Sequence, residues 1–529
     1  SLLPTPYSLF PIPYSLKPMT SIRNFSPVQP LDRFNQQLID QVHPESWQSP
    51  TPQALYDLVV IGAGPAGLVV AAGAAGLGAR VALVERHLMG GDCLNVGCVP
   101  SKCLLSSAQR VGSLKRSASL GVEVRDYQVD FGAVMERMRR IRAELSHHDS
   151  VQRFQDTLGV DVFLGSGAFT GDDRLQVGEH CLRFKKAVIA TGARPRIPEI
   201  PGLATVDYRT NETIFSLTTC PPVLAVIGAG PIGCELAQAF QNLGSQVILF
   251  HHHDRILNRE EPEAAALLQR RLGEDGVHLI LNAQIEQITQ DPGQKTIVYH
   301  CQGEQHRVTV DEILVGAGRS PNVEGLNLEA VGVAYNRQRG VQVNDFLQTT
   351  NPRIYAAGDI CLDQKFTHAA DAAARIVIKN TLFSPGGLGR YRLSQLVIPR
   401  CTYTQPEIAQ VGLSASAAAQ QGIRLNTFKI PLERSDRAVA AGETEGFVQI
   451  QVQEGTDKII GATIVADQAG DLINEITLAM VHNIGLGGIS SVIHPYPTQG
   501  EIIRKAADAY RKTLLTPRTL AFLKFMLRF

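Results

Sequence analysis

The sequence predicts an α/β protein made of two Rossmann-like nucleotide-binding domains and a C-terminal α+β domain. The first observation is an internal repeat. VIGAGPAG at 60–67 recurs as VIGAGPIG at 226–233, each after a short apolar run and before an alanine-rich helical segment. The second is a change of pattern near residue 386, after which strand-like runs such as 445–452 precede an apolar helical segment at 471–483. A chain of 529 residues also exceeds what one core supports, so several domains are expected.

Each repeated string is a GxGxxG motif in a strand, turn and helix context, which is the setting of a dinucleotide fingerprint. The first glycine allows the tight turn, the second lets the backbone approach a pyrophosphate, and the third lets the helix pack against the strand. The helix N-terminus then offers free N–H groups to the phosphates. Two copies predict two bound dinucleotides. The motif glycines are Gly62, Gly64 and Gly67 in the first copy and Gly228, Gly230 and Gly233 in the second.

The residue that ends the next strand distinguishes the two copies. In the first copy it is Glu85, whose carboxylate can accept hydrogen bonds from a ribose diol, which suits the adenosine half of FAD. At the same spacing the second copy has His251, followed by His252 and, three residues further, by Arg255. Imidazoles and a guanidinium in place of the acid favour NADPH over NADH, because an acid would repel a 2′-phosphate. The preference is expected to be mild, since histidines are only partly charged near pH 7, and a polar strand end without a cofactor role is the alternative.

The segment Gly90–Lys102 reads GGDCLNVGCVPSK and follows shortly after the first fingerprint. Its Cys93 and Cys98 are the only pair with a recognisable signature among the nine cysteines of the chain. Two thiols this close can form a small disulfide ring, and a flavin stacked beside one of them could pass it two electrons. The alternative is a structural pair of cysteines in a glycine-rich turn.

This string resembles the redox-active signature of the flavin disulfide reductases, the family of lipoamide dehydrogenase, glutathione reductase and mercuric reductase. The resemblance extends over roughly residues 55–515. It implies that Cys98 is the thiolate on the flavin side and that Cys93 is the outer thiolate that meets the substrate. It also implies that Lys102 lies near the flavin ring with Glu235 as its ion-pair partner. A positive charge there would stabilise a reduced, anionic flavin.

Three further strings resemble the layout of this family. AVIATGARP at 187–195 resembles the crossover out of the flavin domain, and ILVGAGRSPN at 313–322 resembles the return. RIYAAGDI at 353–360 resembles the second flavin fingerprint, whose acid meets the ribityl chain or the phosphates. The candidate cofactor residues in these strings are Thr191, Gly192, Gly318 and Asp359.

The resemblance implies a discontinuous domain organisation. The FAD-binding domain would take residues 51–200 and 316–385, and the NAD(P)-binding domain would be inserted at 201–315. Residues 386–529 would form the interface domain, through which the family dimerises so that the second subunit completes each active site. Residues 1–50 are rich in Pro and Ser, so we expect them to be mostly extended or disordered.

The C-terminal motif departs from the disulfide-reducing members, which carry His-Pro-Thr with a glutamate five residues after the histidine. Here Tyr496 occupies the histidine position, His494 lies two residues upstream, and Glu501 is at the place of the glutamate. A phenol with an unperturbed pKa of about 10 is a poor general base at neutral pH. Tyrosine at this position resembles mercuric reductase, and so does Tyr208. The alternative for both tyrosines is a core or interface aromatic. The last cysteine is Cys401, so the C-terminal vicinal cysteine pair of mercuric reductases is missing.

We therefore expect a homodimeric oxidoreductase that passes electrons from NADPH through FAD and the cysteine pair to Hg(II) or to a disulfide. The main alternative is a disulfide reductase like lipoamide dehydrogenase or glutathione reductase that uses His494. A non-catalytic flavoprotein, such as a redox sensor, is a second alternative. The third is a quinone or dye reductase that works at the flavin without the cysteines.

Composition limits the partners of the chain. The formal net charge is zero, so nothing indicates a nucleic-acid partner. The cysteines outside the pair are scattered, which is typical of a reducing compartment and predicts a cytoplasmic location without a resident metal site. The apolar and cationic run LAFLKFMLRF at 520–529 could touch a membrane surface, although packing on the protein itself or on a partner subunit is favoured.

Overall fold

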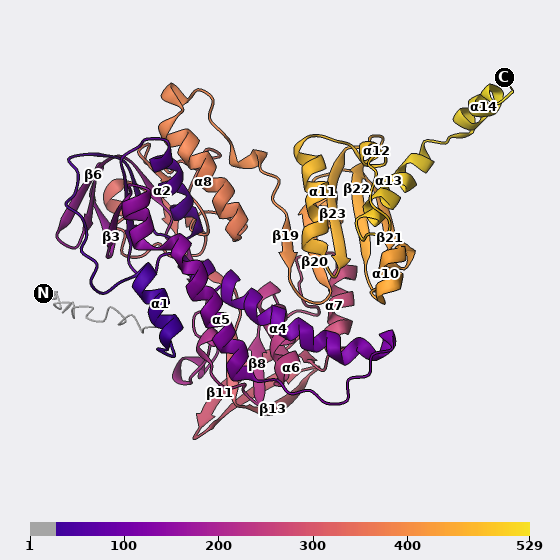
Figure 1. Cartoon of the computed structure of the whole chain (residues 1–529), viewed down its shortest axis with the longest axis horizontal. Coiled ribbons are helices and arrows are strands. Elements are labelled where there is room, and N and C mark those ends of the chain that lie inside the picture. Colours follow the sequence, from indigo (N-terminus) through magenta and orange to yellow (C-terminus); the bar gives the residue numbers. More distant parts are fainter. Residues whose placement is uncertain (1–27, 529) are drawn as a thin grey trace, which may run out of the picture.

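The computed structural model of the chain describes residues 28–528. Figure 1 shows three lobes, one for each large sheet, with the long helices α4 (Cys98–Arg116) and α5 (Phe131–Ser146) running between them. Two of these sheets have parallel cores and the third, at the C-terminal end, is antiparallel. The predicted α/β class with two nucleotide-binding units and a C-terminal α+β unit is confirmed by this arrangement.

Helix α1 (Arg33–Val42) is the first element of the described chain and corrects the expectation of an extended segment over residues 1–50. Asp32 caps it by accepting hydrogen bonds from the backbone N–H groups of Phe34 and Asn35. Its apolar residues recur at helical spacing and are buried in the core of the first lobe; they are Leu38, Ile39 and Val42. Burial of this face overrides the Pro- and Ser-rich composition around it. Residues 1–27 lie outside the described residues.

The first sheet runs in the order β3-β2-β1-β6-β5-β4, with β18 also paired to β6. Strands β3, β2, β1, β6 and β18 are parallel, and every residue of β2 is buried, as expected for a parallel sheet covered on both faces. Helices α2 and α8 pack on each other beside this sheet (Figure 1). The elements are β1 (Tyr56–Ile61), α2 (Pro65–Gly76), β2 (Val81–Glu85), β3 (Asp161–Leu164), β4 (Gly167–Gly171), β5 (Arg174–Val177), β6 (His180–Ile189), β18 (Ile354–Ala356) and α8 (Thr367–Leu382).

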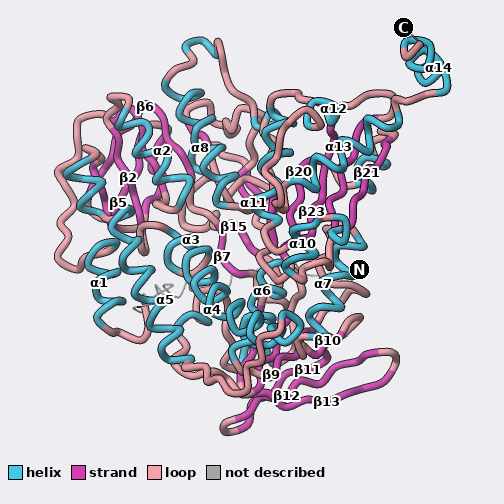
Figure 2. Tube along the Cα trace, turned by 45° about the vertical axis from the view of Figure 1, so that its right-hand side comes forward, coloured by secondary structure: helices cyan, strands magenta, loops and turns pink. Residues whose placement is uncertain are grey.

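The second sheet repeats the parallel unit in the order β10-β9-β8-β14 and is flanked by an antiparallel sheet of β11, β12 and β13. Figure 2 shows β9 to β13 together at one end of the molecule. The elements are β8 (Val223–Ile227), α6 (Pro231–Leu243), β9 (Gln246–Phe250), α7 (Pro262–Glu274), β10 (His278–Ile280), β11 (Gln284–Asp291), β12 (Gln294–Cys301), β13 (Glu304–Val310) and β14 (Glu312–Val315).

The two segments that connect the nucleotide-binding units run side by side. Strand β7 (Ala193–Pro195) leaves the first unit, and β15 (Arg319–Pro321) returns to it as the antiparallel partner of β7. The outward and return strings identified in the sequence therefore meet directly. This pairing holds the ends of the inserted unit together.

The C-terminal lobe is a five-stranded antiparallel sheet in the order β19-β20-β23-β22-β21. Helices α11 and α13 pack on it and bury apolar side chains in a core of their own. The elements are β19 (Arg400–Thr402), β20 (Glu407–Gly412), α9 (Ala415–Gln420), β21 (Leu425–Pro431), α10 (Asp436–Ala441), β22 (Phe447–Gln453), β23 (Ile459–Ala466), α11 (Ala469–Val481), α12 (Leu486–Ile489), α13 (Glu501–Thr513) and α14 (Pro517–Met526).

The last helix, α14, stands away from the C-terminal sheet (Figure 1). None of its residues from Pro517 to Met526 is buried. This helix therefore does not pack on the protein's own surface, and packing on a partner subunit, the other half of the expectation, stays a prediction. Over residues 28–528, the helices are all too short or too polar for a bilayer-crossing segment.

Candidate active site

The first fingerprint forms a tight turn whose backbone is tied to the end of β2. Gly62 has a φ of 103°, which favours glycine, and a Cβ added to Gly67 would lie 1.8 Å from the Gly62 carbonyl oxygen. The buried carboxylate of Glu85 accepts hydrogen bonds from the N–H groups of Ala63 at 2.6 Å and of His87 at 2.7 Å. Gly62, Glu85 and Thr191 line one pocket, so these predicted residues are brought together.

The residues expected to face the rest of FAD gather where β18 ends and β15 begins. Asp359 follows β18, and its burial raises its pKa, while the guanidinium of Arg319 lies 3.4 Å from its carboxylate. Arg319 also pairs with Asp92 of the cysteine loop. Gly192 and Gly318 have φ values of 66° and 111° in the two crossovers. Arg319 itself was not singled out from the sequence, although it directly follows Gly318.

The two cysteines lie at the junction of two helices. Cys93 belongs to α3 (Gly91–Asn95), and Cys98 is the first residue of α4. Both are free thiols, and the Cys93 thiol donates a hydrogen bond to the Cys98 sulfur. A sulfur at the N-terminus of a 19-residue helix also meets the positive end of the helix dipole.

The environment of Cys98 lowers its pKa to about 6. The largest cause is the hydrogen bond from Cys93, and burial opposes it. A hydrogen bond with Thr367, whose Oγ1 lies 3.3 Å from the Cys98 sulfur, and the charge of Lys102 lower the pKa further. The pKa of Cys93 is raised, chiefly because its proton is held by Cys98. These contacts therefore favour a thiolate on Cys98 over one on Cys93.

Lys102 is clamped between the two nucleotide-binding units and the C-terminal lobe. It lies one turn after Cys98 on α4, and its Nζ is 2.8 Å from the carboxylate of Glu235 on α6. The ring of Tyr403 lies 4.3 Å below the same ammonium, and the Tyr403 N–H donates to Glu235 at 2.9 Å. The predicted Lys102–Glu235 pair is thus present, and Tyr403 is a third member.

Sequence reasoning missed both Thr367 and Tyr403. Thr367 opens α8, shortly after the second flavin fingerprint, and Tyr403 follows β19 in a segment that was interpreted only as strand. The position of Thr367 at a helix start was a usable signal. The contact of Tyr403 with Lys102 joins residues about 300 positions apart, so no local sequence pattern could predict it.

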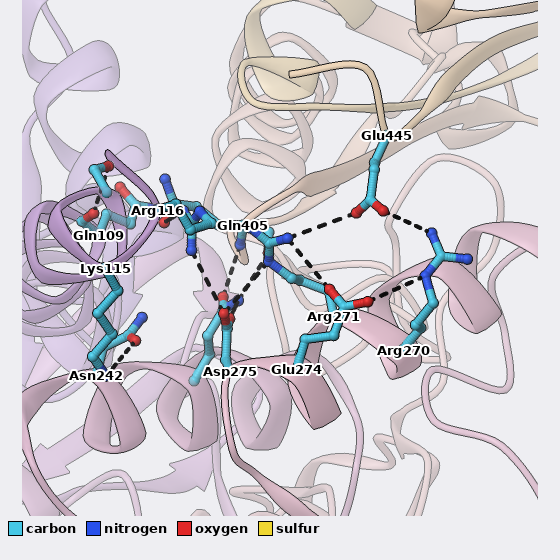
Figure 3. Close-up of polar contacts among 12 residues, drawn as sticks. Gln109, Lys115, Arg116, Asn242, Arg270, Arg271, Glu274, Asp275, Gln405 and Glu445 are labelled. Carbon is cyan, nitrogen blue, oxygen red and sulfur yellow. Dashed lines mark hydrogen bonds and ion pairs between the residues drawn. The ribbon is translucent and has the colours of Figure 1, made fainter. Parts of the chain in front are cut away.

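A polar network fixes the helices behind this site (Figure 3). Asp275 accepts a hydrogen bond from Gln238 at 2.8 Å and pairs with Arg116 at 3.5 Å, so it joins α6 to the C-terminal end of α4. Arg271 reaches Glu445 of the C-terminal lobe at 3.7 Å. The orientation of the cysteine helix is therefore tied to both neighbouring lobes.

The second fingerprint repeats the backbone of the first with a different side chain at the strand end. Gly228 has a φ of 109°, and a Cβ added to Gly233 would again lie 1.8 Å from the carbonyl oxygen of the first glycine. His251 takes the place of the carboxylate, because its Nδ1 accepts from the N–H of Ala229 at 3.3 Å. Burial lowers the pKa of His251 to about 4, so its ring is neutral. The expectation of a partly charged imidazole is therefore wrong at His251.

The proton of the neutral His251 ring resides on Nε2, because Nδ1 serves as the acceptor. This Nε2 is buried and has no hydrogen-bond partner among residues 28–528. His252 and His253 are exposed beside it, and the three imidazoles offer nitrogens within 4.8 Å of one another. This grouping was not foreseen from the sequence, but the Nε2 proton of His251 opposes its use as a metal ligand. Arg255 is half-buried and donates to the carbonyl of Asn258 at 3.1 Å.

The candidate residues of the C-terminal motif are not joined to the cysteines within the described chain. Tyr496 is 71% exposed, and its hydroxyl donates to Asp436 at 2.9 Å. His494 has both carboxylate oxygens of Glu475 at 3.1 Å from its Nε2, and its side chain is 9% exposed. Glu501 pairs with Arg504 and not with His494, whose carboxylate partner is Glu475. Sequence reasoning missed Glu475.

Tyr208 is half-buried against the core of the second unit. Its loop nevertheless reaches the cysteine loop, since the Asn211 side chain donates to the carbonyl oxygen of Val96 at 3.2 Å. The segment that contains Tyr208 therefore borders the segment between the two cysteines. Tyr208 itself has no hydrogen bond to either cysteine over residues 28–528.

Comparisons with known proteins agree with this architecture. The model of the pyridine nucleotide-disulphide oxidoreductases matches residues 56–375, and that of their dimerisation domain matches 398–507. The chain is 35% identical to a mercuric reductase of Staphylococcus aureus over 86% of this chain and 83% of that protein. It is 33% identical to a dihydrolipoyl dehydrogenase of Bacillus subtilis over 85% and 96%. The structure of the HOCl-induced flavoprotein disulfide reductase RclA of Escherichia coli aligns with a TM-score of 0.76 at 27% identity, covering 86% of this chain and 99% of that one.

The two domain models match consecutive segments of the chain, and the chain aligns with most of the length of both relatives. The glycine turns, Glu85 and the buried Nε2 donor of His251 suit the two dinucleotides that this family uses. The chain therefore belongs to the pyridine nucleotide-disulphide oxidoreductase family and is a flavin-dependent enzyme that uses FAD and NAD(P)H.

Proposed function

We propose that this enzyme uses NADPH to reduce Hg(II), through FAD and the thiols of Cys93 and Cys98. The observation that supports it most is a polarised thiol pair in a chain whose C-terminal motif exposes Tyr496 and holds His494 against Glu475. The overall reaction is NADPH + Hg²⁺ → NADP⁺ + H⁺ + Hg⁰. With a disulfide acceptor it would be NADPH + H⁺ + RSSR → NADP⁺ + 2 RSH.

Bound FAD supplies the two-electron chemistry between the nicotinamide and the sulfur pair. The chain's own residues then set the protonation state of each sulfur. Thr367 and Lys102 stabilise the Cys98 thiolate, and the Cys98 sulfur accepts a hydrogen bond from the Cys93 thiol. Loss of the proton of that thiol makes Cys93 a second thiolate, and two thiolates are suitable ligands for a soft cation. Glu235 holds the ammonium of Lys102 at this junction.

The C-terminal motif favours a metal ion over a disulfide as the acceptor. Reduction of a disulfide needs an acid to protonate the leaving thiolate, and His494 would be the natural group. Its ring is held by Glu475 and is nearly covered. Tyr496 is exposed instead, and its hydrogen bond to Asp436 raises its pKa, which makes the phenol a weaker acid for this step. A disulfide reductase that uses His494 remains the second candidate.

A homodimer would bring the exposed tyrosine to the cysteine pair of the partner subunit. The matched dimerisation domain supports this assembly. Large apolar side chains around the motif are exposed in the single chain; they are Leu478, Val481, Ile484, Val492 and Ile493. Their burial between two copies would contribute to association. We propose that Tyr496 and Glu501 act in the partner's site, and that Tyr208 lies close to the metal.

The NADPH preference rests on His251. In its neutral form the ring presents an N–H donor at Nε2, and the oxygens of a 2′-phosphate are strong acceptors. His252 and Arg255 add donors on the exposed side. The predicted domain limits (51–200 with 316–385, 201–315 and 386–529) and the cytoplasmic location remain proposals.

A substrate panel tests the proposed function. NADPH oxidation by wild type would be followed with Hg(II), oxidised glutathione and lipoamide, beside Cys98→Ser and Tyr496→Phe. We expect turnover with Hg(II) that Cys98→Ser abolishes. Turnover with a small disulfide but not with Hg(II) would refute the proposal in favour of the second candidate. Activity with a quinone that survives Cys93→Ala would show a reductase working at the flavin alone.

A further inference from the structure

Helix α14 exposes apolar side chains around most of its circumference. Leu520, Phe522 and Leu523 expose 42%, 60% and 41% of their surface, and no residue between Pro517 and Met526 is buried. Figure 1 shows the helix projecting beyond α13, from which a short linker separates it. A typical surface helix buries an apolar stripe against its own protein, and exposed apolar patches of this kind mark sites of interaction.

The apolar residues are arranged as adjoining faces of one helix. Leu520 and Leu523 are three positions apart and share a face, and Leu527, just past the helix, continues it with 85% of its surface exposed. Phe522 and Met526 are four positions apart and form the neighbouring face. Lys524 lies four positions after Leu520, so this cation borders the leucine face and lies opposite Met526.

The charge of this tail is of one sign. After Asp508, every charged residue is a cation: Arg511, Lys512, Arg518, Lys524 and Arg528. The chain as a whole is balanced, with 50 basic and 50 acidic residues, so the tail is a local concentration of positive charge. Exposed apolar side chains with cations, and without acidic residues, among them suit a segment that binds an anionic membrane interface.

We propose that α14 docks this enzyme on an anionic lipid surface. The apolar faces would enter the boundary of the acyl chains, and Lys524 and Arg528 would meet the headgroups. A ten-residue helix is about half the length needed to cross a bilayer, so it would lie in the plane of the surface. The partner of α14 must bind both its cations and its exposed apolar side chains, and an anionic lipid leaflet can do both.

A second copy of the chain is a weaker occupant for two reasons. The matched dimerisation domain ends at residue 507, ahead of the linker and α14. A copy with zero net charge also provides no excess of acid for five cations. Charge complementarity therefore favours the lipid surface over the partner subunit.

Vesicle flotation of the full-length holoenzyme tests this proposal. The probes are phosphatidylcholine vesicles with and without phosphatidylglycerol, at low and at high salt. Wild type is compared with Leu523→Glu/Met526→Glu, which interrupts both apolar faces, and with Lys524→Glu/Arg528→Glu, which reverses the charge. Leu388→Glu is the matched control, because Leu388 is 78% exposed and lies far from the tail in the sequence. Flavin absorbance and size in solution are measured for each protein.

We expect the bound fraction of wild type to be at least about tenfold higher on the anionic vesicles, and to fall at high salt. Both tail variants should lose this binding while keeping their flavin and their size, and Leu388→Glu should bind like wild type. Equal binding of wild type and both tail variants would overturn the proposal, as would no binding to either vesicle. A dimer that dissociates in the apolar tail variant without any vesicle binding would assign α14 to the partner subunit instead.

Discussion

The two dinucleotide units share one backbone and differ at one side chain. In both, a Cβ on the third glycine would lie 1.8 Å from the first glycine's carbonyl oxygen. In both, the residue at the end of the second strand accepts a hydrogen bond from the N–H that follows the first glycine. The carboxylate of Glu85 can accept further hydrogen bonds from a ligand. His251 already accepts a hydrogen bond at Nδ1, so it offers a ligand only the N–H donor at Nε2. Backbone geometry thus fixes where a dinucleotide sits, and the strand-end side chain sets which ribose it recognises.

The largest effects should come from breaking the shared backbone feature in one unit at a time. Gly67→Ala places a methyl group against a backbone oxygen, so the helix must move away from the strand. We expect FAD content to fall by at least about tenfold, since a misplacement near 1 Å at such a site already costs much binding. Flavin absorbance of the purified protein per chain is the measurement.

Gly233→Ala is the matched variant in the second unit, where the same clash occurs. It should keep FAD close to the wild-type content but lose most of its reduction by NADPH in stopped-flow measurements. Loss of FAD in Gly233→Ala, or full NADPH reactivity, would show that the two units are not independent in this way.

Exchanging the strand-end residue should change specificity rather than binding as a whole. His251→Glu replaces the N–H donor by a carboxylate that repels a 2′-phosphate and accepts from a ribose diol. The ratio of kcat/KM for NADPH to that for NADH should fall by about tenfold or more, which corresponds to about 1.4 kcal/mol. His253→Glu adds the same charge at an exposed position and should change the ratio less. If the ratio is unchanged in His251→Glu, His251 does not determine the preference for NADPH over NADH.

A smaller effect is expected at the Cys98 sulfur, which lies beside Thr367 of α8 in the first unit. Thr367→Val removes one hydrogen bond to the thiolate, so the pKa of Cys98 should rise from about 6 by about one unit. Thiolate absorbance in a pH titration of the reduced enzyme measures it. Thr367→Ser keeps the hydroxyl and should titrate like wild type. Identical titrations of all three proteins would show that Thr367 does not stabilise the Cys98 thiolate.

The pH dependence follows from the same sulfur. Because the pKa of Cys98 is lowered, its thiolate is present above about pH 6 and is lost as the pH falls through that value. Turnover that requires the thiolate should decline on that acid side in wild type. A decline that begins well above pH 7 would indicate that another group controls the reaction.

The features that could be predicted from the sequence are those that short local motifs determine. The glycine turns, the cysteine loop and the two crossovers are short strings whose spacing fixes their geometry, and Lys102 and Glu235 were found through the motifs that contain them. The α1 helix had a usable signal in Asp32 and in the spacing of Leu38 and Val42, but the surrounding composition obscured it. The neutral state of His251 could not be predicted, because it depends on burial.

Long-range pairings account for the remaining differences. Tyr403 lies under Lys102, and Glu475 holds His494, although neither pair is close in sequence. The sequence placed Glu501 by its offset from the tyrosine position, but the helix it opens gives it Arg504 as a partner. Offsets along the chain therefore locate a motif more reliably than they assign its contacts.

The most direct test is an anaerobic titration of the oxidised enzyme with NADPH, followed by absorbance. A thiolate held beside the flavin should give a long-wavelength charge-transfer band after two electrons, and Cys98→Ser should lack that band while still binding FAD. A band that survives in Cys98→Ser, or a wild type that is reduced without any band, would contradict the placement of the Cys98 thiolate at the flavin.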